Sequence, residues 1–220
     1  MLSNVTKDIF NNTVTFTQTG TNILYVAHND VTGTQFNDDV ILNNTGTGSI
    51  RFGQGVGTSS LASGKTITIG ASGFTGLLQI KNFVQNGSTA QDLTQLTGTG
   101  RINLQAGVVF NAVTNINFPQ LNLASCTFND SLFLEKNGAT TNNSTGGNTF
   151  NGFVSITNSG TGNIVFANTT KDIFNADVDI RNSNTALVAL AQNDATGTQF
   201  RGNITVNSSN ATGSIRFGQT

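Results

Sequence analysis

The sequence is poor in the residues that most soluble domains use for surface charge and for covalent cross-links. Its 220 residues contain one cysteine, one proline, one methionine and no tryptophan, and only 10% of them are charged. Globular domains average about 25% charged residues. Cys126 has no partner for an internal disulfide, so we expect it to be a small, buried hydrophobic side chain.

These shortages exclude several classes of protein. The formal net charge is −1 and the Lys and Arg residues are scattered singly, so there is no basic patch to hold a nucleic-acid backbone. No run approaches the roughly 18 apolar residues of a membrane span. Residues 1–4 have neither the basic nor the apolar segment of a signal peptide. We therefore expect no nucleic-acid partner, no membrane span and no signal peptide within this chain.

The residues that are abundant favour strands. Phenylalanine occurs 16 times and glycine 25 times, and Asn, Thr, Ser and Gln supply most of the polar side chains. Asn, Gly, Asp and Thr disfavour long helices, whereas Thr, Val, Ile and Phe suit strands. No segment has a sustained 3.6-residue apolar period. The composition predicts an all-β protein.

Stretches of the sequence return after 164 or 165 residues. The pentapeptide at 7–11 recurs at 171–175, the pentapeptide at 32–36 recurs at 196–200, and the octapeptide at 47–54 recurs at 212–219. We interpret residues 1–220 as a single repetitive domain. Residues 7–170 form one full 164-residue unit, and residues 171–220 begin the next.

A shorter period of roughly 18–27 residues runs inside this unit, usually marked by Phe-Asn. If one further segment begins between Leu61 and Phe110, near Phe83, the unit holds seven segments averaging 23 to 24 residues. This length matches one coil of a parallel β-helix and is too short for a propeller blade of about 40 residues. We predict a parallel β-solenoid of about nine coils, which we expect to be right-handed.

Side-chain alternation predicts which residues face the interior of each coil. In the segment from Phe150, we expect Phe150, Val154 and Ile156 to point inward on one strand and Ile164 and Phe166 on the next. The two copies agree with this assignment, because the inward pairs stay apolar: Val14/Val178, Phe16/Ile180, Leu24/Val188, Val26/Leu190, Val40/Ile204 and Leu42/Val206. Their outward neighbours differ freely: Thr13/Asp177, Thr15/Asp179, Thr17/Arg181 and Asp39/Asn203.

Two columns should hold the coils together. The phenylalanine that opens a coil is expected to stack on the next one inside the core, in the series Phe10, Phe36, Phe110, Phe128, Phe150, Phe174 and Phe200. The asparagine that follows is expected to form an amide ladder at the corner, in the series Asn11, Asn37, Asn111, Asn129, Asn151 and Asn175. The alternative is that each asparagine only satisfies its own turn. Arg201 interrupts the series, so the ladder should break there.

Few residues are candidates for chemistry. Asp177 and Asp179 share one outward face, a geometry suited to a cation or to paired carboxylates, but Thr13 and Thr15 replace them in the other copy. Glu135 is the only glutamate, and His28 corresponds to Gln192. We interpret these residues as solvated surface and predict no catalytic residue, no metal site and no cofactor.

Other outward residues leave two alternatives open. Tyr25, Phe133 and Phe153 could line a surface that binds polysaccharide. An ice-binding face would use the outward threonines Thr13, Thr15 and Thr17. Such a row of threonines must repeat on successive coils, and the next coil has no threonine at residues 39–41. The glycine-rich stretches 70–76 and 86–92 are expected to be protruding turns or loops.

Several phrases of the chain resemble the giant β-strand-repeat surface proteins of Bacteroidota-type bacteria, and more loosely the passenger domains of autotransporters. They include the heptapeptides at 48–54 and 146–152. The resemblance covers nearly the whole chain and brings no catalytic residue with it. It implies a non-catalytic structural or adhesive segment of a long extracellular fibre at the bacterial cell surface. Its expected partners are neighbouring repeat units or identical chains end to end, and surface glycans or a host surface. Polysaccharide binding or degradation is the alternative, and ice binding is a weaker one.

Overall fold

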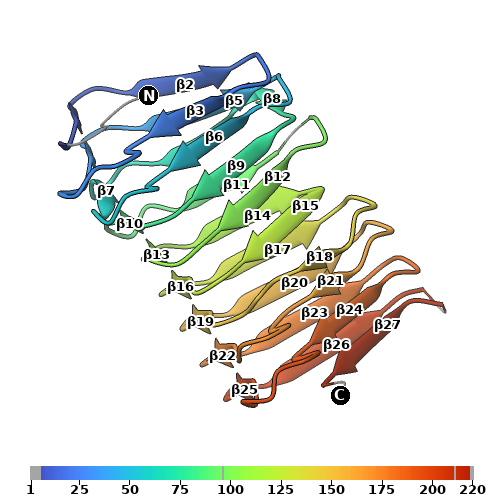
Figure 1. The fold of residues 1–220 in the computed structure, drawn as a ribbon. Coiled ribbons are helices and arrows are strands. Elements are labelled where there is room, and N and C mark those ends of the chain that lie inside the picture. The colour runs from blue at the N-terminus through green and yellow to red at the C-terminus, as the bar shows by residue number, and fades with distance from the viewer. Residues whose placement is uncertain (1–5, 96, 211, 219–220) are drawn as a thin grey trace.

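The chain forms a β-solenoid of nine coils, as the sequence predicts (Figure 1). A computed structural model describes residues 6–95, 97–210 and 212–218, which contain strands and no helix. Each coil has three short strands, and every strand pair is parallel. With about 4.8 Å between neighbouring strands, nine coils form a rod about 40 Å long. Residues 1–4, on which the prediction of no signal peptide depends, and Gln219 of the repeated octapeptide lie outside the described residues.

The first face of the rod is a nine-stranded sheet that runs through all nine coils. Its strands are two or three residues long and contain the residues that open each coil. They are β1 (Ile9–Phe10), β4 (Gln35–Phe36), β7 (Ser59–Leu61), β10 (Phe83–Gln85), β13 (Val108–Phe110), β16 (Thr127–Phe128), β19 (Thr149–Phe150), β22 (Ile173–Phe174) and β25 (Gln199–Phe200).

The second face is also a nine-stranded sheet without a break. Its strands are four to eight residues long, longer than those of the first face. They are β2 (Val14–Gln18), β5 (Val40–Asn44), β8 (Ile67–Phe74), β11 (Gln91–Thr94), β14 (Thr114–Phe118), β17 (Leu132–Lys136), β20 (Val154–Asn158), β23 (Val178–Asn182) and β26 (Ile204–Ser208).

The third face is divided into a sheet of five strands and a sheet of four. The upper sheet contains β3 (Ile23–Val26), β6 (Ser49–Phe52), β9 (Leu77–Ile80), β12 (Arg101–Leu104) and β15 (Gln120–Leu123). The lower sheet contains β18 (Asn142–Asn143), β21 (Ile164–Val165), β24 (Leu187–Leu190) and β27 (Ser214–Phe217).

Gly146 connects the two sheets of the third face. It forms isolated bridges with Ala124 above and Thr170 below, and the N–H of Ser125 donates to its carbonyl oxygen at 3.0 Å. Its φ of +97° and the closeness of the Thr170 carbonyl oxygen leave no room for a Cβ atom. This position therefore requires glycine.

The core fills the interior of the coils, and the predicted alternation is confirmed. Val40, Leu42 and Phe52 are fully buried, whereas outward Thr15 and Asp177 are exposed. The inward residues of the ninth coil, such as Ile204 and Val206, are exposed, because the described residues form no further coil below them.

The fourth coil begins differently from the expectation. Gln85, and not Phe83, takes the column position below Leu61, and Phe83 pairs with Ser59 two residues earlier. Gln85 is fully buried, and its Oε1 accepts from the backbone N–H groups of Asn111 at 2.9 Å and Ala112 at 3.1 Å. A polar side chain can occupy the column because its amide satisfies backbone groups that would otherwise be unpaired.

The glycine-rich stretch 70–76 is not a loop of its own, which corrects the prediction. Strand β8 continues to Phe74, and the residues opposite Leu42 and Asn44 are Ile69 and Phe74. Residues 70–73 therefore lie opposite the single residue Asn43 as a bulge, which bends a strand without ending its pairing. The described residues contain no helix long and apolar enough to cross a membrane.

Candidate functional site

The predicted phenylalanine column lies inside the first face in two stacks. The upper stack joins Phe10 to Phe36, with ring centroids 5.2 Å apart. The lower stack runs through Phe110, Phe128, Phe150, Phe174 and Phe200, with centroids 4.6–5.8 Å apart and rings within 15° of parallel. Leu61 and Gln85 occupy the same column between the two stacks. The column has an internal, structural role.

The predicted asparagine ladder lies at the corner beside this column. Each Nδ2 donates to the Oδ1 of the coil above, and the distances are 2.6–2.8 Å for the pairs Asn37–Asn11, Asn129–Asn111, Asn151–Asn129 and Asn175–Asn151. Asn111 instead donates to the carbonyl oxygen of Gln85 at 2.7 Å. The expected break at Arg201 is wrong, because Arg201 Nη1 donates to Asn175 Oδ1 at 2.9 Å. A ladder residue needs only a donor that points to the coil above, and a guanidinium group supplies one.

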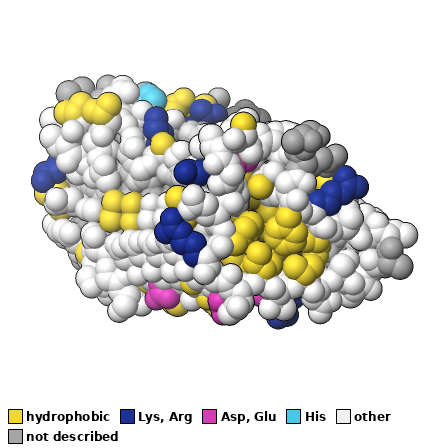
Figure 2. Space-filling view, turned by 90° about the horizontal axis from the view of Figure 1, so that it is seen from below, with side chains coloured by type: hydrophobic (Ala, Val, Ile, Leu, Met, Phe, Trp, Pro, Cys, Tyr) yellow, Lys and Arg dark blue, Asp and Glu magenta, His cyan; other side chains and the backbone are white. Residues whose placement is uncertain are grey.

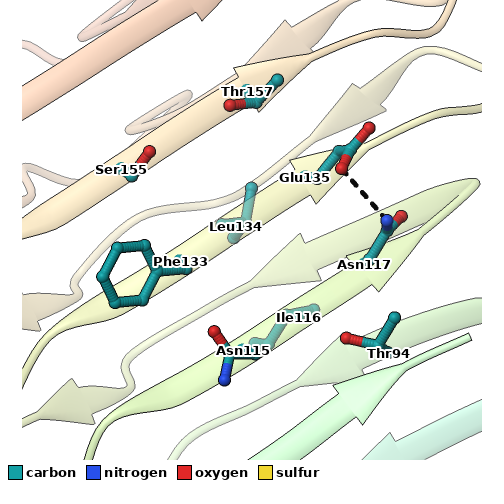
Figure 3. Close-up of a pocket in the computed structure, with 9 residues that line it drawn as sticks. All are labelled: Thr94, Asn115, Ile116, Asn117, Phe133, Leu134, Glu135, Ser155 and Thr157. Atoms are coloured by element: carbon teal, nitrogen blue, oxygen red, sulfur yellow. Dashed lines mark hydrogen bonds between the residues drawn. The ribbon is translucent and has the colours of Figure 1, made fainter.

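The outer surface of the second face has a shallow depression over four consecutive coils (Figure 3). Its volume is about 260 Å³, and the strands that line it are β11, β14, β17 and β20. The outward side chains around it are neutral except for one carboxylate. The lining residues are Thr94, Asn115, Ile116, Asn117, Phe133, Leu134, Glu135, Ser155 and Thr157.

Phe133 is the aromatic residue of this depression. Leu132 and Leu134 point inward on β17, so alternation places Phe133 on the outside, where it is 42% exposed. Its ring centroid lies 5.9 Å from that of Phe153. Two of the three aromatic residues proposed from the sequence therefore pack on one another, with Phe133 exposed and Phe153 half-buried.

Glu135 lies on the same outward side of β17 as Phe133 (Figure 3). Its Oε2 accepts from Asn117 Nδ2 at 3.1 Å, and its Oε1 accepts from Ser159 Oγ at 2.5 Å. Cleavage of a glycosidic bond usually needs two carboxyl groups about 5–9.5 Å apart, and the lining has only one. The arrangement suits recognition of a neutral polar ligand better than two-carboxylate chemistry.

The acidic pair proposed from the sequence does not form a joint site. Asp177 Oδ1 accepts from the backbone N–H of Asn203 at 2.8 Å, whereas Asp179 Oδ2 forms an ion pair with Arg181 at 2.6 Å. Asp38 forms an ion pair with Lys65. Among the described residues there is no group of three or more His, Cys, Asp or Glu side chains that could hold a metal ion.

Tyr25 and His28 lie far from the Phe133 pair in the sequence and pack on one another. Their ring centroids are 4.0 Å apart, and both side chains are half-buried on the third-face side of the first coil. Arg51 lies next to Tyr25 in the strand register. Tyr25 is thus engaged by its neighbour and does not extend the aromatic surface of the second face.

A buried polar cluster that the sequence did not reveal lies at the corner between the third and first faces. Asp172 is fully buried, and its Oδ1 accepts from the backbone N–H of Asn148 at 2.8 Å and from Asn148 Nδ2 at 2.9 Å. Asn148 Oδ1 in turn accepts from the N–H of Cys126 at 3.0 Å. Cys126 is buried as predicted, and burial raises the pKa of its thiol to about 12, which makes it unreactive.

Lys136 is a second buried charge that was not foreseen. It follows Leu132 and Leu134 at an inward position, and its Nζ donates to the carbonyl oxygen of Gly162 at 2.9 Å and also to that of Gly138. The equivalent Asn158 also donates to the Gly162 carbonyl, at 3.1 Å. Lys136 therefore ties the turns of two coils together, and burial lowers the pKa of its ammonium group to about 8.

Asp172 makes the stability of the protein depend on pH. Burial raises the pKa of its carboxyl group from 3.8 to about 7, although the donors from Asn148 and the Ala167 backbone oppose this shift. Between pH 4 and pH 7 the unfolded chain loses this proton while the folded chain keeps it. The contribution of Asp172 to the free energy of unfolding is therefore full below pH 4 and is lost as the pH rises to 7. A shift of this size corresponds to about 4 kcal/mol.

We expect Asp172→Asn to remove this dependence, because an amide does not titrate. Relative to the wild type, the variant should gain up to about 4 kcal/mol in its free energy of unfolding between pH 4 and pH 8. Urea unfolding followed by circular dichroism at a series of pH values measures this difference. All other titrating groups are common to both chains and cancel. Parallel pH profiles for the two chains would contradict the assignment.

Comparisons with protein-family models, with curated proteins and with solved structures find no match to this chain. What the protein does is therefore inferred from its own residues, contacts and surfaces.

Proposed function

We propose that the chain is a non-catalytic structural and adhesive segment of a long extracellular bacterial fibre. The observation that supports this most directly is the pair of nine-stranded parallel sheets that run from the first coil to the last without interruption. In a solenoid each coil contacts only its neighbours, so the rod can lengthen by added coils without a change in cross-section. This is the property that a fibre needs.

The repeat phrases of the chain are the support for a location at the cell surface. The chain has few charges and many Asn, Thr and Ser side chains. Its repeat phrases resemble those of bacterial surface proteins. Neighbouring repeat units would be its main structural partners, and its flat outer faces would meet glycans or a host surface.

Location at the cell surface is tested on the producing bacterium. Antibodies against the folded chain should label intact cells, and a protease added outside should remove the label, because the rod would project into the medium. A cytoplasmic protein serves as the control for cell integrity. Labelling that appears only after the cells are permeabilised would contradict the proposal.

The second candidate function is binding of a polysaccharide in the depression around Phe133. The C–H face of a sugar ring packs on an aromatic side chain, and sugar hydroxyl groups bond to carboxylates and amides. Phe133, Glu135 and Asn115 offer these groups on one side of the second face. A site that spans four coils also matches a chain-like ligand better than a compact one.

We expect a neutral polysaccharide on a glycan array to bind the chain with weak affinity, which calorimetry would measure. Phe133→Ala should weaken binding at least about 10-fold, since it removes an aromatic contact worth roughly 1.4 kcal/mol or more. Glu135→Gln tests whether the carboxylate contributes to binding of the polysaccharide. Asn207→Ala, on the exposed outer side of β26, is the matched control and should bind normally. Binding that survives Phe133→Ala would place the ligand elsewhere, and release of reducing sugar would indicate an enzyme.

A further inference from the structure

One stretch of the third face does not vary between the two sequence copies. The octapeptide at 47–54 recurs unchanged. Ile50 and Phe52 are fully buried and belong to the core. Gly48 and Gly53 must be glycine, because a Cβ atom at these positions would lie 2.1 Å and 1.8 Å from backbone oxygens of the adjacent coils. Close packing therefore explains why these four residues are kept.

Packing does not explain the outward residues Thr47, Ser49 and Arg51 of the same stretch. Thr47 is exposed and the other two are half-buried. Among the described residues, none of the three side chains has a hydrogen-bond or ion-pair partner. Outward residues of the second face differ between the copies, as Thr15 and Asp179 do. Outward side chains that stay the same without a partner in the protein point to a partner outside it.

Thr47 and Ser49 line a depression on the outer surface of the third face. Its volume is about 250 Å³. Ser49, Leu77, Arg101 and Gln120 follow one another in the strand register, so the depression spans the four coils from β6 to β15. The other lining residues are Thr75, Gly76 and Thr99. The lining thus offers hydroxyl and amide groups around one exposed guanidinium group, that of Arg101.

The third face around this depression carries positive charge only. Residues 45–55, 75–82 and 97–106 build this side of three successive coils and contain no Asp or Glu. Their cations are Arg51, Lys81 and Arg101. These cations are scattered singly in the sequence, and the coils bring them to one side of the rod. In Figure 2 most of the Asp and Glu side chains in view lie along the lower edge, apart from most of the Lys and Arg side chains.

We propose that this side of the rod binds an acidic polysaccharide, with Arg101 holding the carboxylate of one sugar and Arg51 that of another. A guanidinium group binds a carboxylate through two parallel hydrogen bonds. The hydroxyl groups of Thr47 and Ser49 can donate to and accept from the hydroxyl groups of the sugars. With no carboxylate nearby, nothing on this side repels an acidic ligand.

The spacing of the two arginines favours a polymer over a small acid. Arg51 pairs with Gln79, Gln79 pairs with Asn103, and Arg101 is two residues before Asn103. The Cα atoms of the two arginines are therefore two coils and two residues apart, about 12 Å. A single exposed ion pair contributes little. Contact at both arginines by one chain raises the affinity, because the second contact forms within the same complex.

Nucleic acid fits this surface less well. Proteins that hold a phosphate backbone make about 6–10 phosphate contacts, and this side has three cations. Binding of single strands also needs exposed aromatic rings on which bases stack, but Tyr25 is half-buried against His28. The site is separate from the Phe133 depression on the second face. The proposal goes beyond the fibre function, because it holds wherever the protein is located.

Alginate and hyaluronate, two linear polymers that contain uronic acids, are the probes. Alginate with its carboxylates converted to neutral esters is the matched polymer. In calorimetry at low salt, we expect the acidic polymers to bind and the ester to bind at least about 10-fold more weakly. Raising the salt from about 20 mM to about 500 mM should weaken binding of the acidic polymers strongly, because exposed charges are screened.

Charge-neutralising variants locate the site. Arg101→Gln should weaken binding about 5-fold or more, and the double variant Arg51→Gln, Arg101→Gln should weaken it further. Arg201→Gln removes the same charge from an exposed position on the first face and is the matched control. It should bind normally, and so should Phe133→Ala, because the second face is not involved. Circular dichroism shows that each variant folds.

Three results would overturn the proposal. Equal binding of alginate and its ester would show that carboxylates are not recognised. Equal losses in Arg101→Gln and Arg201→Gln would show general attraction to net charge and no site. No binding of either acidic polymer at low salt, or tighter binding of single-stranded DNA than of both, would exclude an acidic polysaccharide. None of these results bears on the fibre proposal, which is judged separately by labelling of intact cells.

Discussion

The stacking of apolar side chains between successive coils is the interaction on which the whole structure depends. A single coil of some 24 residues has no core of its own and buries its inward side chains only against the coils above and below it. Each fully buried large side chain contributes about 1.5–3 kcal/mol. This dependence explains three features together. The inward residues of the two sequence copies stay apolar, the outward residues are free to differ, and inward residues become exposed in the ninth coil, the last that the structure describes.

Much of this architecture can be predicted from the sequence, because the packing imposes a simple pattern on it. Alternation placed Val40 and Leu42 inside, and Phe-Asn marked most coils. The prediction failed where a polar group replaces an apolar one in the interior. Gln85 takes a phenylalanine position because its amide bonds to the backbone of the next coil. Alternation along the strand places Lys136 on the same inward side as Leu132 and Leu134, so its burial could have been predicted from the sequence. The carbonyl groups that accept from it belong to turns that only the fold brings together.

The outer surface allowed less to be predicted, since no packing constrains it. Tyr25, Phe133 and Phe153 are equal candidates in the sequence, but only the fold packs Phe133 and Phe153 on one another and leaves Tyr25 apart from them. Glycine is common in both bulges and loops, so the sequence alone does not distinguish the bulge at 70–73 from a loop. The proposed binding site thus depends on outward residues of particular coils, whereas the packing of the rod depends on inward residues of all of them. A structural role and a recognition site are compatible in one solenoid for this reason.

The central claim is that internal packing, and not the external amide ladder, holds the coils together. Phe150 and Asn151 are neighbours in the same coil. One is fully buried between two rings, and the other is exposed and bonded to two asparagines. The most direct measurement is the free energy of unfolding of Phe150→Ala and of Asn151→Ala in urea. The account predicts a loss of about 3–5 kcal/mol for the first variant and about 1 kcal/mol for the second. Equal losses, or a larger loss for Asn151→Ala, would contradict it.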